Sequence, residues 1–434
     1  MKIRYFPLII SIIFLLFSCA SQPKGAKNTQ AEGQLIRKIP ADYAGLVHAG
    51  RTKTQQEIDY LDYLGAKWML HTFSWIRIEP EPGVWDFEHY DEIVDIAVPA
   101  GIKILGILAY SHTYIHEDNT TNRYIPPDKI HHFLEYVQRT VEHFRGRVDA
   151  WCIWNEPNTK RFWTGTAEEF FELNRRTAEL VRELDSDVLL MGGAFNRGVF
   201  GLPKKYIRGI FESGSMEKVD AVAFHPYEIS PNRTAKLFDK FQKEVAVYGF
   251  GDKIWITEMG YPTGGLYPTK VPERKKSEYL IKTWTLLAIR DNHMLLWYQL
   301  FDPEERERSN SEHFFGLVRS MDDYTSKAAE AFRLCATYLS GTSYSAQELQ
   351  RINLPKNLAS YYFAGNETNT LVLWKNGAGS KKIRIKLSGT NHIIHDLDSG
   401  AETAIQADTV IKVKSKPVFI TWQGDGEQPV LSKK

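Results

Sequence analysis

The sequence between residues 44 and 301 repeats one pattern: a short apolar run followed by a longer amphipathic stretch. The amphipathic stretches, such as Glu168–Leu184 and Ser277–Ile289, place apolar residues at helical spacing. Because neighbouring parallel strands need a helical crossover, this alternation predicts a parallel sheet. Eight runs have strand character: Ala44–His48, Trp68–Phe73, Lys103–Ala109, Val148–Trp154, Val188–Gly193, Val219–His225, Lys253–Glu258 and Met294–Phe301.

Eight strand–helix units favour an α/β fold of the TIM (β/α)8 barrel type over an open, doubly wound sheet. A dinucleotide-binding fold has little support, because no Gly-x-Gly-x-x-Gly segment follows the first apolar run. We therefore expect the barrel to occupy residues 41–345.

After Gly341 the pattern changes to short strands separated by turn signals such as Asn376-Gly377. The run Ile383–Leu387 alternates apolar and charged residues, which gives a strand one buried face and one solvated face. These features predict a C-terminal all-β sandwich domain over residues 346–424, followed by a disordered tail over residues 425–434.

The N-terminus has the features of a secretory signal. Lys2 and Arg4 precede the apolar run Leu8–Phe17, and the segment Leu16–Cys19 follows. This run of ten residues, nine of them apolar, is too short to span a bilayer, which takes about 20. The Leu-x-Ser-Cys ending resembles a bacterial lipobox, whose cysteine receives lipid and becomes the mature N-terminus.

We therefore expect a signal peptide over residues 1–18 and lipidation at Cys19. Residues 19–40 are rich in small and polar residues and are expected to form a flexible tether. This arrangement predicts a lipid-anchored, extracytoplasmic protein of the cell envelope. The alternative is a plain signal or an uncleaved anchor.

The charge balance and the cysteines exclude other classes of protein. The chain has 54 Lys+Arg and 53 Asp+Glu, whereas a nucleic-acid partner calls for a basic surplus. Cys152 and Cys335 lie in apolar patterns and are expected as buried thiols. The sequence has neither a cysteine–histidine cluster nor a calcium loop, so no metal and no cofactor is expected. The oligomeric state stays open.

Two glutamates lie at the C-terminal ends of the fourth and seventh predicted strands. Glu156 stands in Trp154–Asn158 (Trp-Asn-Glu-Pro-Asn), and Glu258 stands in Ile256–Gly260 (Ile-Thr-Glu-Met-Gly). Strand ends of a barrel gather on one face, so these carboxylates can approach each other. Because a carboxylate in apolar surroundings costs desolvation energy unless it is paired, the pair indicates a function. Two facing carboxylates are the groups that a retaining glycosidase uses.

Over about residues 41–340 the chain resembles the retaining glycoside hydrolases whose barrel carries catalytic glutamates on strands four and seven. Within that clan it resembles the β-xylosidase-like and exopolysaccharide-hydrolase group, glycoside hydrolase family 39; the segment Trp75–Asp86 fits the second-strand signature. The resemblance implies that Glu156 is the acid/base and Glu258 the nucleophile. The expected reaction is cleavage of a β-linked glycan by double displacement.

The resemblance also implies roles in substrate binding. Asn155 would hold the sugar 2-hydroxyl, and Tyr227, in the segment His225–Tyr227, would donate a hydrogen bond to the nucleophile. Trp297 would form the floor under the bound sugar, and Trp163 would line a neighbouring subsite. For His225, Trp297 and Trp163 the alternative is a packing role.

One position departs from the family pattern. Leu70 stands where an arginine usually lies near the nucleophile. Loss of that positive charge would raise the pKa of the nucleophile. Compensation would have to come from His71 or Arg77, and strand alternation turns His71 away from the side that Leu70 faces.

Three alternatives to a hydrolase stay open. A carbohydrate-binding protein without turnover is favoured by Leu70, a transglycosidase would use the same residues, and a structural envelope lipoprotein would use the barrel only as a scaffold. The expected partner is a carbohydrate in each of the first two cases. The sequence leaves open the sugar, its linkage, exo or endo action, and the membrane that holds the anchor. The β-domain either binds glycan or braces the barrel, and bracing is favoured.

Overall fold

The computed structural model describes residues 36–47, 55–117, 123–197, 201–266, 270–303, 305–318, 326–424 and 428–434. Ile36–Lys434 forms one compact unit. The predicted signal peptide, the lipidation site Cys19 and most of the predicted tether lie outside the described residues. Within the described ranges, no helix combines the length and apolarity needed to cross a membrane.

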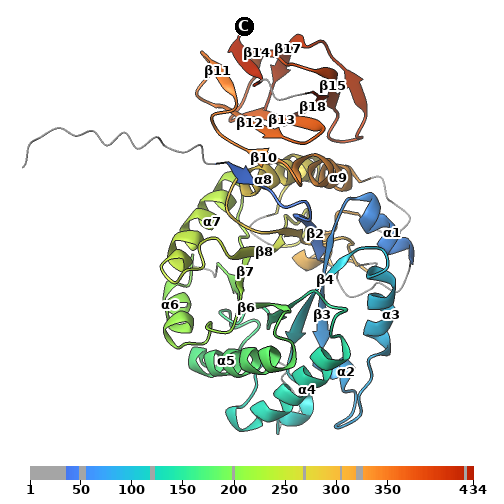
Figure 1. The fold of residues 1–434 in the computed structure, drawn as a ribbon, viewed down its shortest axis with the longest axis vertical. Coiled ribbons are helices and arrows are strands. Elements are labelled where there is room, and N and C mark those ends of the chain that lie inside the picture. Colours follow the sequence, from blue (N-terminus) through green and yellow to red (C-terminus); the bar gives the residue numbers. More distant parts are fainter. Residues whose placement is uncertain are drawn as a thin grey trace, which may run out of the picture. The chain divides into compact units, whose positions relative to one another are not determined.

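A closed barrel of eight parallel strands confirms the predicted TIM fold (Figure 1). The strands follow sequence order, and the first pairs with the last. The eighth strand is shorter than expected. The strands are β2 (Ala44–Val47), β3 (Trp68–Ser74), β4 (Lys103–Ala109), β5 (Ala150–Ile153), β6 (Leu189–Asn196), β7 (Ala221–His225), β8 (Ile254–Met259) and β9 (Leu295–Trp297).

Helices surround the barrel and bury their apolar faces against it (Figure 1). The start of α5 shows how the sequence sets a boundary: Thr166 and Glu169 form a capping box, each side chain accepting the other's backbone N–H. The α-helices are α1 (Gln55–Tyr63), α2 (Trp75–Ile78), α3 (Glu88–Ala97), α4 (Ile130–His143), α5 (Ala167–Leu184), α6 (Lys204–Glu212), α7 (Pro231–Ala246), α8 (Lys276–Ala288) and α9 (Lys327–Leu339). Short 3-10 helices are η1 (Thr113–Ile115), η2 (Pro127–Lys129), η3 (Glu273–Lys275) and η4 (Ser311–Phe314).

Close packing between neighbouring strands requires glycine at position 106. A Cβ atom on Gly106 of β4 would lie 2.3 Å from the ring of Trp151 in β5. That ring is buried and meets Phe73 of β3 edge-on, at 4.9 Å between ring centres. The missing side chain thus makes room for a tryptophan in the adjacent strand. Cys152 and Cys335 are buried, free thiols, as predicted.

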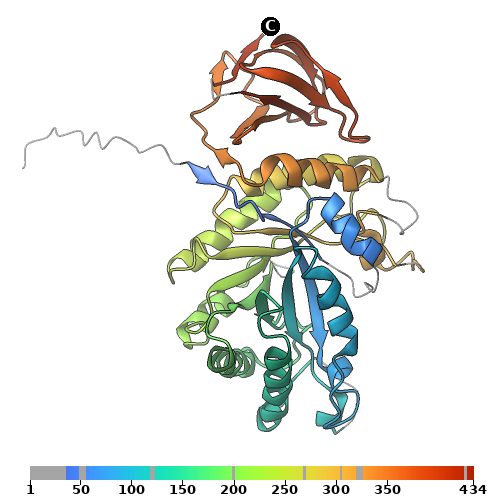
Figure 2. The same ribbon diagram turned by 45° about the vertical axis from the view of Figure 1, so that its right-hand side comes forward.

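The C-terminal domain consists of two sheets that enclose a second core, which confirms the predicted sandwich (Figure 2). Leu371 and Ile420 of one sheet and Ile385 and Leu431 of the other lie in this core. The seven-stranded sheet contains β1 (Arg37–Lys38), β10 (Ser343–Tyr344), β12 (Leu358–Ala364), β13 (Thr368–Lys375), β18 (Val418–Gln423), β15 (Thr390–His395) and β16 (Glu402–Ala404). The four-stranded sheet contains β11 (Gln350–Ile352), β19 (Val430–Lys433), β14 (Lys381–Lys386) and β17 (Asp408–Val413).

The structure corrects the predicted boundaries of this domain. The expected disordered tail contains β19, which pairs with β11 and β14, because Leu431 inserts into the sandwich core. Strand β1 lies in the segment predicted as tether, and β10 lies in the segment assigned to the barrel, yet both extend the seven-stranded sheet. Strands of two residues carry too little pattern to be recognised in a sequence.

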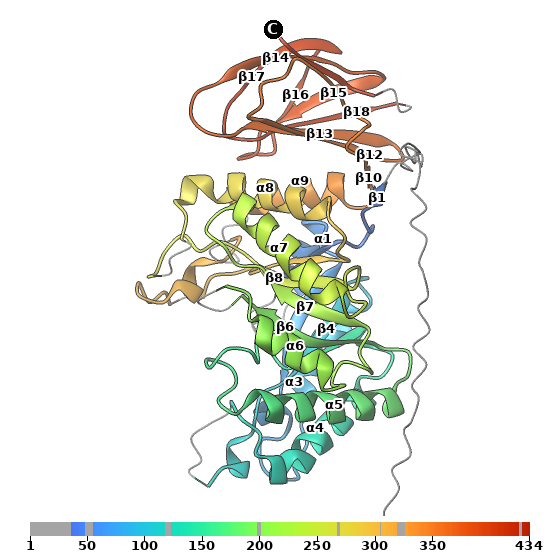
Figure 3. The same cartoon turned by 90° about the vertical axis from the view of Figure 1, so that its left-hand side faces the viewer.

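The seven-stranded sheet packs against α8 and α9 (Figure 3). Val372, Trp374 and Phe419 belong to the same buried cluster as the barrel. The hydroxyl of Thr370 donates a hydrogen bond of 3.1 Å to the carbonyl of Tyr338 in α9. A continuous apolar core between the domains is the kind of contact that a bracing domain makes.

The pairing of β19 predicts that the C-terminus contributes to stability. Leu431→Ala should lower the free energy of unfolding by about 2–5 kcal/mol, because it removes a buried side chain and leaves a cavity. Ser432→Ala, at the next position of the same strand, should change it by less than about 0.5 kcal/mol. Urea unfolding followed by circular dichroism measures both. Equal, small effects would contradict the assignment of β19 as a packed strand.

Candidate active site

Glu156 lies directly after β5, and its side chain is 8% exposed. Its Oε1 accepts a hydrogen bond of 2.6 Å from the Asn196 side-chain amide, at the end of β6. The same oxygen lies 2.7 Å from Nδ1 of His225, at the end of β7. Three neighbouring strands therefore hold this carboxylate in place.

The loop that carries Glu156 has a strained backbone. Trp154 and Glu156 have φ angles of 64° and 45°, in the left-handed region that residues other than glycine rarely adopt. The Trp154 indole is fully buried and donates a hydrogen bond of 2.8 Å to the Phe162 carbonyl. The Asn158 side chain exchanges hydrogen bonds of 2.8 and 2.9 Å with the backbone of Asn196. Strain that surrounding contacts maintain is typical of functional sites.

Glu258 lies near the end of β8, with its side chain 13% exposed. The Tyr227 hydroxyl donates a hydrogen bond of 3.0 Å to its Oε2, which is the contact expected from the sequence. Burial raises the pKa of Glu258 to about 7; His225 opposes this rise, and the charge of Glu156 adds to it.

His225 connects the two carboxylates. Its Nδ1 lies 2.7 Å from Glu156 and 3.6 Å from Glu258 Oε2, and its Nε2 lies 3.0 Å from the Thr257 hydroxyl. Burial by itself lowers the pKa of an imidazole, but Glu258 and Glu156 together raise the pKa of His225 above its ordinary value. One oxygen of each glutamate and a ring nitrogen of His225 all lie within 4.8 Å of one another.

These three side chains also have the chemical composition of a metal site. In this structure the His225 ring and the Glu156 carboxylate are joined by a direct hydrogen bond of 2.7 Å.

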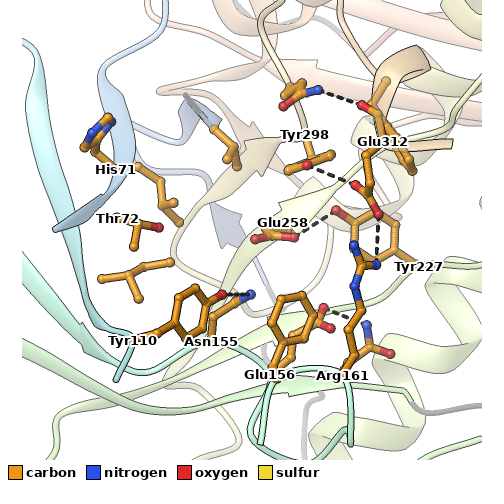
Figure 4. A pocket seen from close by; sticks show the side chains of 17 residues that line it. His71, Thr72, Tyr110, Asn155, Glu156, Arg161, Tyr227, Glu258, Tyr298 and Glu312 are labelled. Carbon is orange, nitrogen blue, oxygen red and sulfur yellow. Dashed lines mark hydrogen bonds and ion pairs between the residues drawn. The ribbon is translucent and has the colours of Figure 1, made fainter. Parts of the chain in front are cut away.

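Both glutamates line one cavity of about 410 Å³ (Figure 4). Asn155 also lines it, and its side-chain amide donates a hydrogen bond of 3.2 Å to the Tyr110 hydroxyl. The lining residues are Val47, Leu70, His71, Thr72, Ile107, Tyr110, Asn155, Glu156, Arg161, Phe162, Asn196, Tyr227, Glu258, Tyr298, Gln299, Glu312 and Phe315.

Leu70 faces this cavity, together with Val47 and Ile107, and forms an apolar wall. His71 turns the other way: its ring lies 5.6 Å from the Tyr90 ring of α3 and points away from Glu258 in Figure 4. Arg77 is exposed in α2. The Glu258 carboxylate is contacted by His225 and Tyr227, from the end of β7, and Leu70 leaves the β3 side of the cavity apolar.

Two predicted substrate contacts are corrected. Trp297 is fully buried and packs against Tyr261, which hydrogen-bonds α8, so its ring lies on the helix side of the barrel. Neighbouring residues of a strand point to opposite faces, and the next residue, Tyr298, lines the cavity instead. Trp163 is 2% exposed and donates a hydrogen bond to the Thr166 carbonyl, whereas its neighbour Phe162 lines the cavity. Both tryptophans have the packing role that was the alternative.

Sequence reasoning missed Arg161 and Glu312, which form an ion pair of 3.0 Å beside the catalytic pair. The Tyr298 hydroxyl donates a hydrogen bond of 3.0 Å to Glu312. Glu312 lies in a long connection after β9, where no strand pattern marks its position. Arg161 lies shortly after the Glu156 motif in the sequence, and this closeness was the one sequence feature that could have pointed to it.

The electrostatics predict that Leu70→Arg lowers the pKa of Glu258 from about 7 toward the ordinary range, because a guanidinium would stabilise the ionised carboxylate. A carboxyl whose pKa is raised by folding favours the folded state at low pH, and that contribution is lost as the pH rises through about 7. The variant should therefore lose less stability between pH 4.5 and 7, the interval between the ordinary pKa of the carboxyl and its raised value in the folded protein.

Carbon-13 NMR titration of the glutamate carboxyls measures this pKa directly, with Glu258→Gln assigning the resonance. Leu70→Met keeps the volume and the neutral charge of the side chain and serves as the control. An unchanged Glu258 titration in Leu70→Arg would contradict the explanation.

The comparisons agree with this geometry. The model of glycosyl hydrolases family 39 matches residues 28–250, more than half of the 434-residue chain. A β-1,4-xylanase of Dictyoglomus thermophilum is 27% identical over 161 residues, 35% of this chain and 43% of the relative. A β-xylosidase of Caldicellulosiruptor saccharolyticus is 27% identical over 123 residues, 25% of each chain. The chain thus spans less than half the length of these two relatives.

Among solved structures, a family 39 glycoside hydrolase from the gut symbiont Bacteroides cellulosilyticus WH2 superposes with a TM-score of 0.72 at 20% identity. The superposition covers 89% of this chain and 81% of that one, and it supports the fold. The family match, together with the barrel that brings the two motif glutamates into one cavity, shows that this chain belongs to the glycosyl hydrolases of family 39.

Proposed function

We propose that this protein is a retaining glycoside hydrolase that cleaves β-linked glycosidic bonds of an oligo- or polysaccharide. The observation that carries the proposal is the meeting of Glu156 and Glu258, 102 positions apart (258 − 156), in one cavity with carboxylate oxygens within 4.8 Å. Retaining enzymes hold their carboxyl groups about 5–5.5 Å apart, and inverting enzymes about 6.5–9.5 Å apart. The observed separation favours retention.

In the proposed first step, ionised Glu258 attacks the anomeric carbon while the bond to the leaving oxygen breaks. Glu156 donates its proton to that oxygen. In the second step, water attacks the same carbon, Glu156 takes the proton of the water, and the bond to Glu258 breaks. Two inversions at one carbon retain its configuration.

A neighbouring side chain supports this division of work. The Tyr227 hydroxyl donates a hydrogen bond to Glu258, which favours the ionised form that the nucleophile needs. Positive charge that develops at the anomeric carbon in the transition state stabilises that negative charge further. Asn196 and His225 keep Glu156 oriented throughout. Tyr227 keeps Glu258 oriented.

For the sugar, we propose only a class of substrate. The names of two relatives refer to xylan or xyloside cleavage, which makes β-xylosides the first substrates to try. A carbohydrate-binding protein without turnover is the second candidate, because burial raises the pKa of the nucleophile and Leu70 carries no charge to lower it. A transglycosidase would differ only in the acceptor of the second step.

We also propose that the N-terminus anchors the protein to the cell envelope through lipid on Cys19, with the enzyme outside the cytoplasm. The sequence pattern of residues 1–19 supports this proposal. Metabolic labelling with a fatty acid should mark the wild type and leave Cys19→Ala unlabelled. Equal labelling of both proteins would refute the assignment.

Two measurements test the proposed function: the anomeric configuration of the first product, and the activity of two glutamate variants. The first product seen by proton NMR should have the anomeric configuration of the substrate. Glu258→Gln should abolish turnover. Glu156→Gln should lower kcat/KM by about 10²–10⁴-fold for poor leaving groups, and much less for a nitrophenyl glycoside, which needs no proton from the enzyme.

Glu172→Gln is the matched control, because Glu172 is an exposed glutamate of α5 paired with Arg175. Its activity should equal that of the wild type. Substrate binding without product would support the carbohydrate-binding alternative. Longer products at high substrate concentration would reveal a transglycosidase.

A further inference from the structure

Arg161 and Glu312 come from opposite sides of the barrel. Arg161 follows β5 and Glu312 follows β9, and these strands are four steps apart in either direction around the eight-stranded barrel. Their side chains nevertheless meet, with Nη1 of Arg161 3.0 Å from Oε1 of Glu312. Figure 4 shows Arg161 extending from the side of Glu156 up to Glu312. The ion pair therefore joins loops from opposite strands along one side of the cavity and forms a bridge there.

The pair lies nearer to solvent than the catalytic carboxylates. The side chains of Arg161 and Glu312 are 59% and 33% exposed, against 8% for Glu156 and 13% for Glu258. The pair thus lies at the mouth of the cavity, above the reacting groups. A guanidinium and a carboxylate in direct contact leave no gap through which a sugar ring could pass.

Several contacts fix Glu312 in this position. Its carboxylate accepts a hydrogen bond from the Tyr298 hydroxyl. Its backbone carbonyl accepts a hydrogen bond of 3.0 Å from the Gln299 side chain. Residues on either side of Glu312 are also joined to each other: the backbone N–H of Gly316 donates a hydrogen bond of 2.7 Å to the buried carboxylate of Asp302. On the other side, the Arg161 guanidinium lies 5.1 Å from the centre of the Phe162 ring.

The cavity has two unequal sides around this bridge. On one side, Tyr227 lies next to the ion pair (Figure 4), and the ring of Phe315 packs at 5.9 Å from that of Tyr227. On the other side, the lining comes from β3 and β4, with Thr72 and Ile107. A glycan that enters from the second side meets the bridge and ends there.

We propose that the Arg161–Glu312 ion pair closes one end of the substrate cleft, so that the enzyme acts at the end of a glycan chain. The pair determines specificity and takes no part in bond breaking. This inference rests on the proposed hydrolase function and adds the mode of attack, exo rather than endo.

The experiment compares terminal with internal cleavage. A panel of nitrophenyl β-glycosides first identifies the sugar that the wild type cleaves. Oligosaccharides of that sugar, labelled at the reducing end, are then digested, and the labelled products are measured by mass spectrometry. The wild type should release products from one end. The double variant Arg161→Ala/Glu312→Ala should raise the ratio of internal to terminal cuts by about fivefold or more, the effect of an exposed ion pair at the upper end of its range.

The surface pair Arg175 and Glu172, 2.8 Å apart on α5, supplies a matched control. Arg175→Ala/Glu172→Ala should leave the ratio of internal to terminal cuts at the wild-type value, and Arg161→Lys, which keeps the charge, should stay close to it. Thermal unfolding checks that each variant is folded, and Arg161→Gln replaces the double variant if the latter is not.

Frequent internal cuts by the wild type, or an unchanged ratio in the folded bridge variants, would overturn the inference. If the wild type cleaves none of the glycosides, the proposed hydrolase function itself fails. The two failures are therefore distinguishable.

Discussion

The parallel closure of eight strands is the constraint on which the site depends. In a barrel of parallel strands, every strand ends on the same face, so residues far apart in sequence come together there. Glu156 follows β5, His225 ends β7, and Glu258 lies near the end of β8. A strained loop and buried aromatic rings then set the direction of Glu156. The barrel thus supplies proximity, and its loops supply orientation.

Charge is concentrated in this cavity with little solvent to screen it. Glu156 and Glu258 face each other across His225, and the more exposed Glu312 is paired with Arg161. Burial explains why the pKa of Glu258 rises, and the charges of Glu258 and Glu156 explain why the imidazole of His225 holds its proton more tightly. With Leu70 in the wall, a histidine beside the nucleophile provides a charge that depends on pH, whereas an arginine would provide a permanent one.

The errors of the sequence analysis share one cause. Trp297 and Trp163 were expected in the cavity, but their neighbours Tyr298 and Phe162 line it. At a strand end or in a tight loop, a shift of one residue exchanges a buried face for a functional one. A similar limit applies to the predicted disordered tail, because the pairing of β19 with β11 and β14 depends on distant segments.

The amino-acid sequence was enough to predict the barrel, the sandwich, and the motifs of Glu156 and Glu258, because these follow from local periodicity and from short motifs at strand ends. It also identified Leu70 as a departure that leaves the nucleophile without its usual cation. The three-dimensional fold was needed to show how close the carboxylates lie, which aromatic ring faces the cavity, and that Arg161 meets Glu312 beside it. These depend on side-chain directions and on contacts between distant loops, which no local pattern encodes.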